Sequence, residues 1–504
     1  MKAKDEDSIF DLYIIGGGIN GVGVAVDAAG RGLKVGLCEK GDLANATSSA
    51  SSKLIHGGLR YLEQYDFRLV KEALAEREIL LKLAPHIAWP LRFCLPHRPQ
   101  LRPFWMIRAG LFLYDNLSSR VSLKGSKSIY FDDTSPLQKS FKKGFEYSDA
   151  WIDDARLVIL NAIKLQQLGG TVKTRTEVVS ASRNDGLWQL QIRNVMSDKC
   201  SMVKSLALVN ATGPWVSAMM KDAFSMSPPR EISLIKGSHI VVPKIHDEDR
   251  AYLLQNDDKR IVFVLPYEET FSLIGTTDVV YHGDPSDASC SRYEIDYLCN
   301  VVNQHFKSKI SKSDIVWTYA GVRPLCADES DSPQAITRDY TIEVDAGFGD
   351  APLLSIFGGK LTTYRKLGEA AMEKLAQYFP GIGGKWTSSS VLPGGEDIGS
   401  AQSFAERLAN QYPWLTSDQV NRFSTSYGSL AYRFLKEAVS ANHLGEHFGA
   451  GLTAAEVDYL INNEWACTSE DILWRRSKMG LKMSQSEQNK LNTYVVSKMG
   501  HHNY

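Results

Sequence analysis

The sequence lacks several features that would place it in a specialised class of proteins. It contains no run of 18 apolar residues, so we expect no transmembrane helix. The opening stretch, MKAKDEDSIFD, is polar and acidic and has no apolar segment, so we expect no secretion signal. The 57 Lys and Arg residues balance the 58 Asp and Glu residues, which argues against a nucleic-acid partner.

The cysteines are also few, odd in number and scattered, and no two of them form a CxxC pair. This pattern argues against a disulfide framework and a zinc site, and we predict no metal site. Reduced thiols fit a cytoplasmic setting. With 504 residues, of which 43% are hydrophobic, the chain is long enough for two or three domains. The seven cysteines are Cys38, Cys94, Cys200, Cys290, Cys299, Cys326 and Cys467.

A glycine-rich turn between two apolar strands is the most informative motif. Residues 12–15 are all apolar, as in a parallel strand buried on both faces, and they lead into GGGING at 16–21. Apolar residues then recur at helical spacing up to Gly32. A second apolar strand, Val35–Cys38, ends at Glu39. This βαβ unit with the G-x-G-x-x-G spacing predicts a dinucleotide-binding site.

Each part of this unit has a role in such a site. Gly16 permits the tight turn, and Gly18 lets backbone amides approach a pyrophosphate at the helix N-terminus. Gly21 lets the helix lie close to the strand. Glu39 is suited to accept hydrogen bonds from the adenosine ribose, and an acid here disfavours a 2′-phosphate. FAD or NAD is therefore favoured over NADP.

Residues 41–63 are rich in Ser, Thr and Gly, which favours a loop, either solvated or wrapped around a polar cofactor. With this loop a resemblance becomes specific. GGGINGVG followed by ATSSASSKLIHGGLRYLE resembles the start of the aerobic, flavin-dependent glycerol-3-phosphate dehydrogenases, members of the D-amino-acid-oxidase-like flavoprotein superfamily. Further matching motifs are KGSHIVVP, GTTDV, AGVRPL (with Ala320 in place of Ser), SDSPQAITRDY and FGGKLTTYRKL.

The resemblance implies an FAD enzyme that oxidises sn-glycerol 3-phosphate to dihydroxyacetone phosphate. It implies hydride transfer from C2 of the substrate to flavin N5, with the electrons then passed to a membrane quinone. It also implies a peripheral or monotopic place on a phospholipid surface, at the cytoplasmic face of the inner membrane.

The resemblance also assigns residues to the site, and four basic side chains at strand ends or glycine turns support a pocket for a phosphate dianion. The catalytic candidates are His239 as base, Arg323 on the phosphate and Lys360 beside the flavin. The substrate-binding candidates are Arg60, Tyr61, Thr276, Asp278, Arg323 and Lys360. The cofactor-binding candidates are Gly16, Gly18, Ile19, Asn20, Gly21, Glu39, Thr47, Ser48, Ser52, Leu54, His56, Gly57, Gly58, Val178, Gly213, Gly359, Lys360, Leu361 and Thr362.

Residues 89–117 mix large aromatic side chains with arginines. Taken alone, the pattern fits equally a core helix with flanking arginines and a helix that lies in a membrane interface. The resemblance favours a membrane-contact segment.

The predicted fold class is α/β, with a Rossmann-like FAD-binding domain, an inserted antiparallel-sheet substrate domain and a C-terminal helical domain. Short β-rich runs from about residue 232 predict the inserted sheet. A second strand–glycine–helix junction lies at Gly358-Gly359. The predicted ranges are 10–85 with 145–230 and 330–392 for FAD, 86–144 with 231–329 for the substrate, and 393–504 for the C-terminal domain.

Several alternatives remain open from the sequence. A glycerol-3-phosphate oxidase would pass electrons to oxygen and release peroxide. An NAD-linked alcohol dehydrogenase would lack the second glycine junction, and a flavin-bearing sensor would use its C-terminal helices to contact a partner. Those helices would equally serve in a homodimer. Covalent attachment of the flavin through His56 is a further, less favoured alternative.

Overall fold

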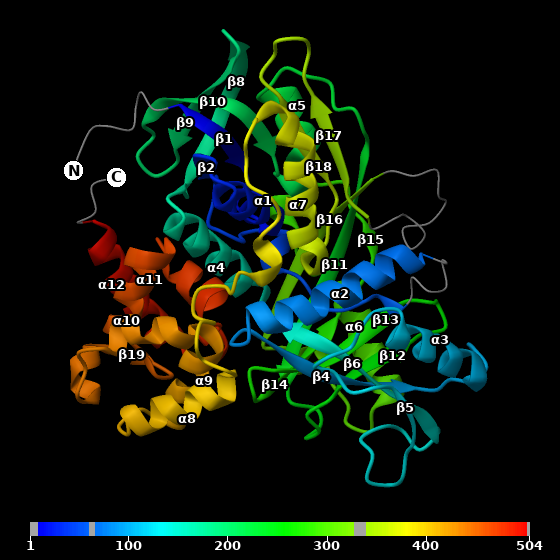
Figure 1. Cartoon of the computed structure of the whole chain (residues 1–504). Helices are drawn as coiled ribbons and strands as arrows, with labels where there is room; N and C mark the ends of the chain where they lie inside the picture. The colour runs from blue at the N-terminus through cyan, green and yellow to red at the C-terminus, as the bar shows by residue number, and fades with distance from the viewer. Residues whose placement is uncertain (1–8, 60–65, 327–338, 501–504) are drawn as a thin grey trace.

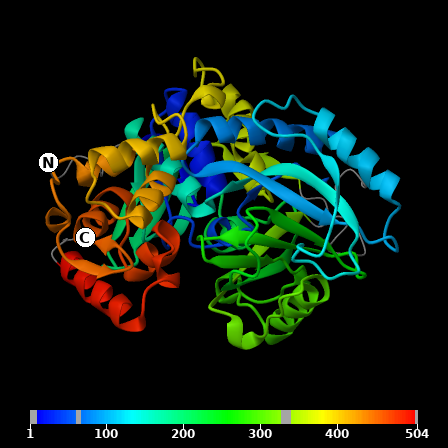
Figure 2. The ribbon, with the colours of Figure 1, turned by 90° about the horizontal axis from the view of Figure 1, so that it is seen from below.

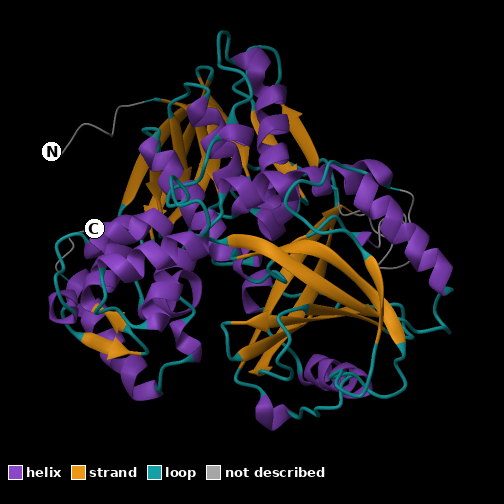
Figure 3. Cartoon of the chain, turned by 60° about the horizontal axis from the view of Figure 1, so that its bottom comes forward, coloured by secondary structure: helices purple, strands orange, loops and turns teal. Residues whose placement is uncertain are grey.

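The structure is a computed structural model that describes residues 9–59, 66–326 and 339–500. Two large β-sheets and a mostly helical C-terminal region make up this part of the chain (Figure 1). Figure 3 shows two large groups of strands, with the C-terminal helices and a small strand pair beside them. The predicted α/β fold class, with a Rossmann-like sheet, a second sheet and a C-terminal helical region, is confirmed.

The first sheet has eight strands, and its centre is parallel because β1 pairs in parallel with both β10 and β2. Leu12 and Ile14 pack on one face with α1, α4 and α7, whereas Tyr13 and Ile15 pack on the other face with β8, β9 and α5. Burial on both faces explains the unbroken apolar run in β1. The strands are β1 (Phe10–Ile15), β2 (Val35–Cys38), β7 (Thr171–Lys173), β8 (Thr176–Asn184), β9 (Leu187–Asn194), β10 (Cys200–Asn210), β17 (Thr341–Asp345) and β18 (Leu353–Phe357).

The second sheet has ten strands in the order β15-β11-β14-β13-β12-β4-β6-β3, with β16 on β11 and β5 on β6. It is antiparallel except where β12 pairs with β4. Its strands are β3 (Leu54–Ile55), β4 (Ala88–Pro96), β5 (Lys127–Tyr130), β6 (Lys143–Ile152), β11 (Ile232–Pro243), β12 (Ala251–Gln255), β13 (Ile261–Tyr267), β14 (Phe271–Gly275), β15 (Val279–Val280) and β16 (Trp317–Cys326).

Seven helices accompany the sheets within the described residues before position 393. They are α1 (Ile19–Gly30), α2 (Phe67–Leu83), α3 (Phe104–Asn116), α4 (Asp154–Gln167), α5 (Val216–Asp222), α6 (Arg292–His305) and α7 (Tyr364–Leu375). Helix α6 covers the second sheet, where Leu298 and Val302 pack with Ile240 of β11.

The C-terminal region lies on one side of the molecule and the second sheet on the other when the chain is seen from below (Figure 2). Leu460 of this region belongs to the same hydrophobic cluster as Leu160 of α4 and Leu367 of α7. The C-terminal region therefore shares its core with the helices that cover the first sheet. Its elements are α8 (Ala401–Gln411), α9 (Ser417–Ser426), α10 (Tyr432–Leu435), β19 (His447–Gly449), β20 (Leu452–Thr453), α11 (Ala454–Glu464) and α12 (Gln485–Met499).

Both interpretations of residues 89–117 require a helix, but this stretch does not form a single helix. Its first part is β4, an inner strand that pairs with β6 and β12, and only α3 is helical. Alternate residues of a strand share a face, so Trp89 lies on the same face as the buried Leu91 and Phe93, whereas the half-buried Arg92 lies on the other face. No helix in the described ranges is long and apolar enough to cross a membrane.

One further detail differs from the predicted domain ranges. Strand β6 lies in the second sheet, whereas the predicted range 145–230 assigns most of it to the cofactor-binding part. The domain ranges as a whole stay predictions.

Candidate functional site

The first glycine turn leaves the N-terminus of α1 open to an anion. Gly16 has a φ of +113°, and a Cβ at this position would lie 2.5 Å from the carbonyl oxygen of Ala211. No acidic residue lies in the first turn of α1, and the N-cap residue is Gly18. The Ser48 hydroxyl accepts a hydrogen bond from the Ile19 N–H at 3.0 Å. The helix dipole and the backbone N–H groups at this helix N-terminus suit the turn to a pyrophosphate.

Glu39 follows β2 immediately, as the βαβ unit predicts. Its Oε2 accepts a hydrogen bond from the Gly17 N–H and its Oε1 one from the Gly41 N–H, both at 2.7 Å. Burial raises the pKa of Glu39, and the two backbone N–H groups oppose that rise. Each carboxylate oxygen keeps a further lone pair for a ribose hydroxyl, so the ribose role stays a prediction with suitable geometry.

The second glycine turn lies against the first, although the two are far apart in sequence. The Asn20 Nδ2 donates to the carbonyl oxygen of Gly358 at 3.1 Å. Helices α1 and α7 pack closely (Figure 1), and a Cβ at Gly368 would lie 2.9 Å from the Gly23 carbonyl oxygen. Lys360 precedes the single 3-10 turn that leads into α7. The N-terminal ends of both helices thus converge on one region.

The polar loop after β2 runs between the two sheets. The Thr47 hydroxyl donates to the Val322 carbonyl oxygen of β16 at 2.6 Å, and Leu54 joins the edge of the second sheet as part of β3. The Gly57 N–H donates to the Tyr114 hydroxyl at 2.8 Å. Val178 is buried in a cluster that contains Cys38, beside Glu39. Gly213 follows β10 with a φ of +57°.

The arginine assigned to the phosphate lies among polar partners. Arg323 Nη1 contacts Asp278 Oδ1 at 2.6 Å, and its Nη2 donates to the Thr276 hydroxyl at 3.3 Å. A Cβ at Gly358 would lie 3.5 Å from the carbonyl oxygen of Pro324, so the second glycine turn abuts β16 next to Arg323. The structure thus brings together three substrate candidates. Arg60 and Tyr61 lie outside the described residues.

His239 lies in β11, opposite Gly275 of β14 and Tyr319 of β16. Its ring stacks on Tyr319 with centroids 4.7 Å apart, and its Nε2 lies 2.9 Å from the Ser52 hydroxyl oxygen. Burial, followed by the positive charges of Arg323 and Lys53, lowers the pKa of His239 well below 6.5. The imidazole is therefore neutral at pH 7, as a general base must be. Ser52, a cofactor candidate, contacts the catalytic candidate in this structure.

Glu294 is a residue of this site that the sequence analysis misses. Its Oε1 accepts from the hydroxyls of Ser238 (2.8 Å) and Thr277 (2.7 Å), and its Oε2 contacts Lys236 Nζ at 2.9 Å. Burial opposes ionisation, but the hydrogen bonds from Lys236, Ser291 and Thr277 outweigh it and lower the pKa of Glu294 to about 2. The sequence signal, Ser291-x-x-Glu294, indicates only a capping box, which is also formed.

A second missed group is the buried ion pair of Lys53 and Asp154, with 2.6 Å between Nζ and Oδ1. The Asp154 Oδ2 accepts from the Ser51 hydroxyl at 2.7 Å. This pair ties the polar loop to α4 and places a positive charge near His239. Nothing in the local pattern distinguishes Lys53 from a solvated lysine.

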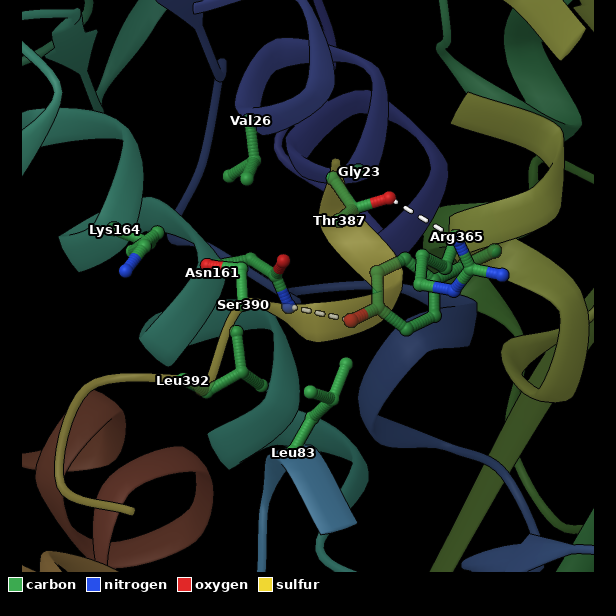
Figure 4. A pocket seen from close by; sticks show the side chains of 10 residues that line it. Gly23, Val26, Leu83, Asn161, Lys164, Arg365, Thr387, Ser390 and Leu392 are labelled. Carbon is green, nitrogen blue, oxygen red and sulfur yellow. Dashed lines mark hydrogen bonds between the residues drawn. The ribbon is translucent and has the colours of Figure 1, made fainter. Parts of the chain in front are cut away.

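The cavity in Figure 4 is not the substrate site. It lies between α1, α4, α7 and residues 387–392, and its volume is about 20 Å³, room for one water molecule. Asn161 Nδ2 donates to the Tyr364 hydroxyl at 3.2 Å, and Arg365 Nη1 to the Thr387 hydroxyl at 3.1 Å. These contacts fix α7 against α4 and the following segment.

Comparison with known families decides the class of this site. The model of the FAD-dependent oxidoreductases matches residues 11–365, and that of the C-terminal domain of alpha-glycerophosphate oxidase matches residues 386–502. The chain belongs to the FAD-dependent oxidoreductase family. This FAD-dependent oxidoreductase therefore uses FAD as its cofactor, and the two converging glycine turns fit that group.

Two curated relatives and one solved structure are similar over nearly the whole chain. The aerobic glycerol-3-phosphate dehydrogenase of Escherichia coli K12 is 56% identical over 96% of this chain and 97% of its own length. The D-erythritol 1-phosphate dehydrogenase of Brucella abortus is 49% identical over 96% of this chain and 97% of its own. The glycerol-3-phosphate dehydrogenase from Bacillus halodurans, solved with FAD, has a TM-score of 0.76 at 26% identity and covers 99% and 92% of the two chains. The resemblance to aerobic glycerol-3-phosphate dehydrogenases is confirmed at the level of the family.

Proposed function

We propose that this FAD-dependent oxidoreductase oxidises sn-glycerol 3-phosphate to dihydroxyacetone phosphate and passes the electrons to a membrane quinone. The Escherichia coli relative carries the name of this activity. The observation that carries the proposal is the placement of Arg323 beside Thr276 and Asp278, on a strand that also borders His239.

Arg323 holds the substrate phosphate in this proposal. A guanidinium donates two parallel hydrogen bonds to a phosphate, and the Thr276 hydroxyl helps to orient it. In the structure Asp278 occupies one side of Arg323. The phosphate therefore competes with a carboxylate, which favours a dianionic ligand over a neutral polyol.

His239 takes the proton from the C2 hydroxyl, because its lowered pKa keeps the ring neutral. Ser52 is within hydrogen-bond reach of Nε2 and sets the orientation of the ring. Bound FAD supplies the hydride acceptor for C2. Lys360 and the N-terminal end of α7 add positive potential next to the cofactor.

A phospholipid surface at the cytoplasmic face of the inner membrane is the proposed site of electron transfer. Helix α3 supports this, since it exposes Trp105, Met106, Phe112 and Leu113 while it buries Ile107, Leu111 and Tyr114. An exposed apolar helix face is typical of interfacial contact. In this scheme the first sheet holds FAD and the second sheet holds the substrate.

The decisive experiment is anaerobic reduction of the bound flavin by sn-glycerol 3-phosphate, followed by its absorbance. Arg323→Met should require at least about 100-fold more substrate, since a charged contact to the ligand is lost. Arg92→Met is the matched control: Arg92 lies in the same sheet, pairs with Glu146 at 2.6 Å and has similar exposure (23% against 26%). Equal behaviour of the two variants would overturn the phosphate assignment.

The acceptor is tested separately with the same protein. Rapid reduction of a short-chain quinone without peroxide supports the dehydrogenase, and stoichiometric peroxide in air supports the oxidase alternative. D-erythritol phosphate serves as a competing substrate, because a relative is named for its oxidation.

A further inference from the structure

Two adjacent arginines of the C-terminal region contact the turn that follows β2. This turn, residues 39–44, carries Glu39. Arg476 Nη1 and Nη2 lie 2.6 and 2.8 Å from Asp42 Oδ2 and Oδ1. Arg475 Nε donates to Asp42 Oδ2 at 2.6 Å. The side chains of Asp42 and Arg476 are fully buried. We call Asp42, Arg475 and Arg476 the Asp42 cluster.

The same turn is held at a second point. The Arg175 N–H donates to the Gly41 carbonyl oxygen at 2.9 Å, and the Arg175 guanidinium contacts Asp471 Oδ2 at 2.6 Å. Asp471 also accepts a hydrogen bond from the Arg475 guanidinium. Residues 471–476 of the C-terminal region therefore contact this turn both directly and through Arg175.

The other side of the turn faces the cofactor site. The Gly41 N–H donates to Glu39, and the Ala44 N–H donates to the Gly17 carbonyl oxygen at 3.1 Å. Glu39 in turn accepts from the Gly17 N–H. One short turn thus joins the first glycine turn to two buried arginines more than 430 residues away in sequence.

We propose that the Asp42 cluster couples the C-terminal region to FAD binding, with Asp42, Arg475 and Arg476 as positioning residues for Glu39. The inference rests on the family's cofactor and not on the proposed substrate. Coupling between two parts of a protein is reciprocal. FAD therefore orders the segment Asp471–Arg476, and loss of the cluster weakens FAD binding.

The first test measures the dissociation constant of FAD for the full-length, flavin-stripped chain by quenching of flavin fluorescence. Asp42→Asn and Arg476→Met should each raise it about 10-fold, a typical size for coupling between sites. Arg422→Met is the matched control. Arg422 contacts Glu456 and the Gly451 carbonyl oxygen wholly within the C-terminal region, with no contact to the turn. An unchanged constant in Asp42→Asn, or an equal rise in Arg422→Met, would overturn the proposal.

The second test needs no variant and holds even where Asp42→Asn does not fold. Hydrogen exchange of residues 471–476 is compared in the wild-type chain with and without FAD, and α8 serves as the internal reference. Slower exchange of residues 471–476 with FAD, and no change in α8, is the expected result. Equal exchange in both states contradicts the coupling. A catalytically inert protein that still shows this protection would refute the proposed substrate and leave this inference standing.

Discussion

Asn20 and Gly358 are 338 residues apart, yet the Nδ2 of one donates to the carbonyl oxygen of the other at 3.1 Å. This hydrogen bond joins the two glycine turns at the N-terminal ends of α1 and α7. A Cβ at Gly359 would lie 2.6 Å from the same Nδ2. The two turns therefore form one surface, on which a single extended cofactor can contact both helix ends.

Replacement of Asn20 by Asp should weaken FAD binding. A carboxylate would face the Gly358 carbonyl oxygen without a donor and would add negative charge where the pyrophosphate binds, so we expect the dissociation constant of FAD to rise 10- to 100-fold, or about 1.4 to 3 kcal/mol. A flavin titration of the stripped protein measures it. Asn116→Asp is the control, because Asn116 also donates to a backbone carbonyl but lies on α3. An effect of equal size at Asn116 would refute the assignment.

Glu294→Gln should raise the KM for the phosphate ester more than it lowers kcat. The variant keeps the shape of Glu294 but loses the charge that holds Thr277, which lies between the two partners of Arg323. Loss of one charge-assisted hydrogen bond costs about 1.5–3 kcal/mol, so we expect a tenfold or larger rise in KM. Steady-state kinetics with a dye acceptor measure both constants.

The control for this prediction is Glu248→Gln. Like Glu294, Glu248 accepts hydrogen bonds from a basic side chain and a hydroxyl, here those of Arg250 and Tyr252. It lies away from Arg323, in the chain segment before β12. A similar rise in KM in both variants would mean that the sheet as a whole, and not the Glu294 contacts, positions the pocket.

The rate should stay insensitive to acid down to an unusually low pH. Because burial, Arg323 and Lys53 lower the pKa of His239 well below 6.5, the base stays unprotonated on lowering the pH through 6.5. The acidic limb of kcat/KM should therefore lie below pH 6.5. In the double variant Lys53→Met, Asp154→Asn the limb should move to higher pH, since a positive charge near the ring is removed. A wild-type limb centred at or above 6.5 would exclude His239 as the base.

His86 should make the fold sensitive to acid. Burial, with a contribution from Arg156, lowers the pKa of His86 to about 3 in the folded chain, against 6.5 as the ordinary value. As the pH falls below 6.5, the unfolded chain binds the proton first. The contribution of His86 to the free energy of unfolding is therefore fully present above pH 6.5 and is lost progressively down to about pH 3. At pH 5 the loss is about 2 kcal/mol.

His86→Leu should remove this part of the pH dependence, as measured by urea unfolding at pH 7 and pH 5. His447→Gln is the control, because His447 is exposed at β19. A difference between the two pH values that is unchanged in His86→Leu would show that other groups cause the acid sensitivity.

Substitution of the exposed aromatic residues of α3 should weaken binding to anionic lipid vesicles. Trp105 and Phe112 are 68% and 60% exposed. Burial of each ring in a membrane interface contributes about 1.5–3 kcal/mol, so the double variant Trp105→Ser, Phe112→Ser should bind at least 100-fold more weakly in a sedimentation assay. Phe348→Ser removes a fully exposed ring between β17 and β18 and should have no effect. Equal loss in both proteins would refute a role for α3.

The sequence by itself determined the β1–α1–β2 unit, the place of Glu39 at its end and the class of cofactor. These features depend on neighbours in the chain: apolar periodicity, glycines at a fixed spacing and a strand of four residues. The strand–glycine–helix junction at Gly358 was readable for the same reason. Residues 89–96 were not, because a mixture of aromatic and basic residues does not reveal whether its period is two or nearly four.

Only the tertiary structure decided which distant residues meet. The contacts of Ser52 with His239, of Glu294 with Thr277 and of Asp42 with Arg476 join residues between 17 and 434 positions apart. A serine, a capping glutamate and a lone aspartate look ordinary in a linear chain. They acquire their roles because packing removes them from water. In the protein interior a polar or charged group must find a partner.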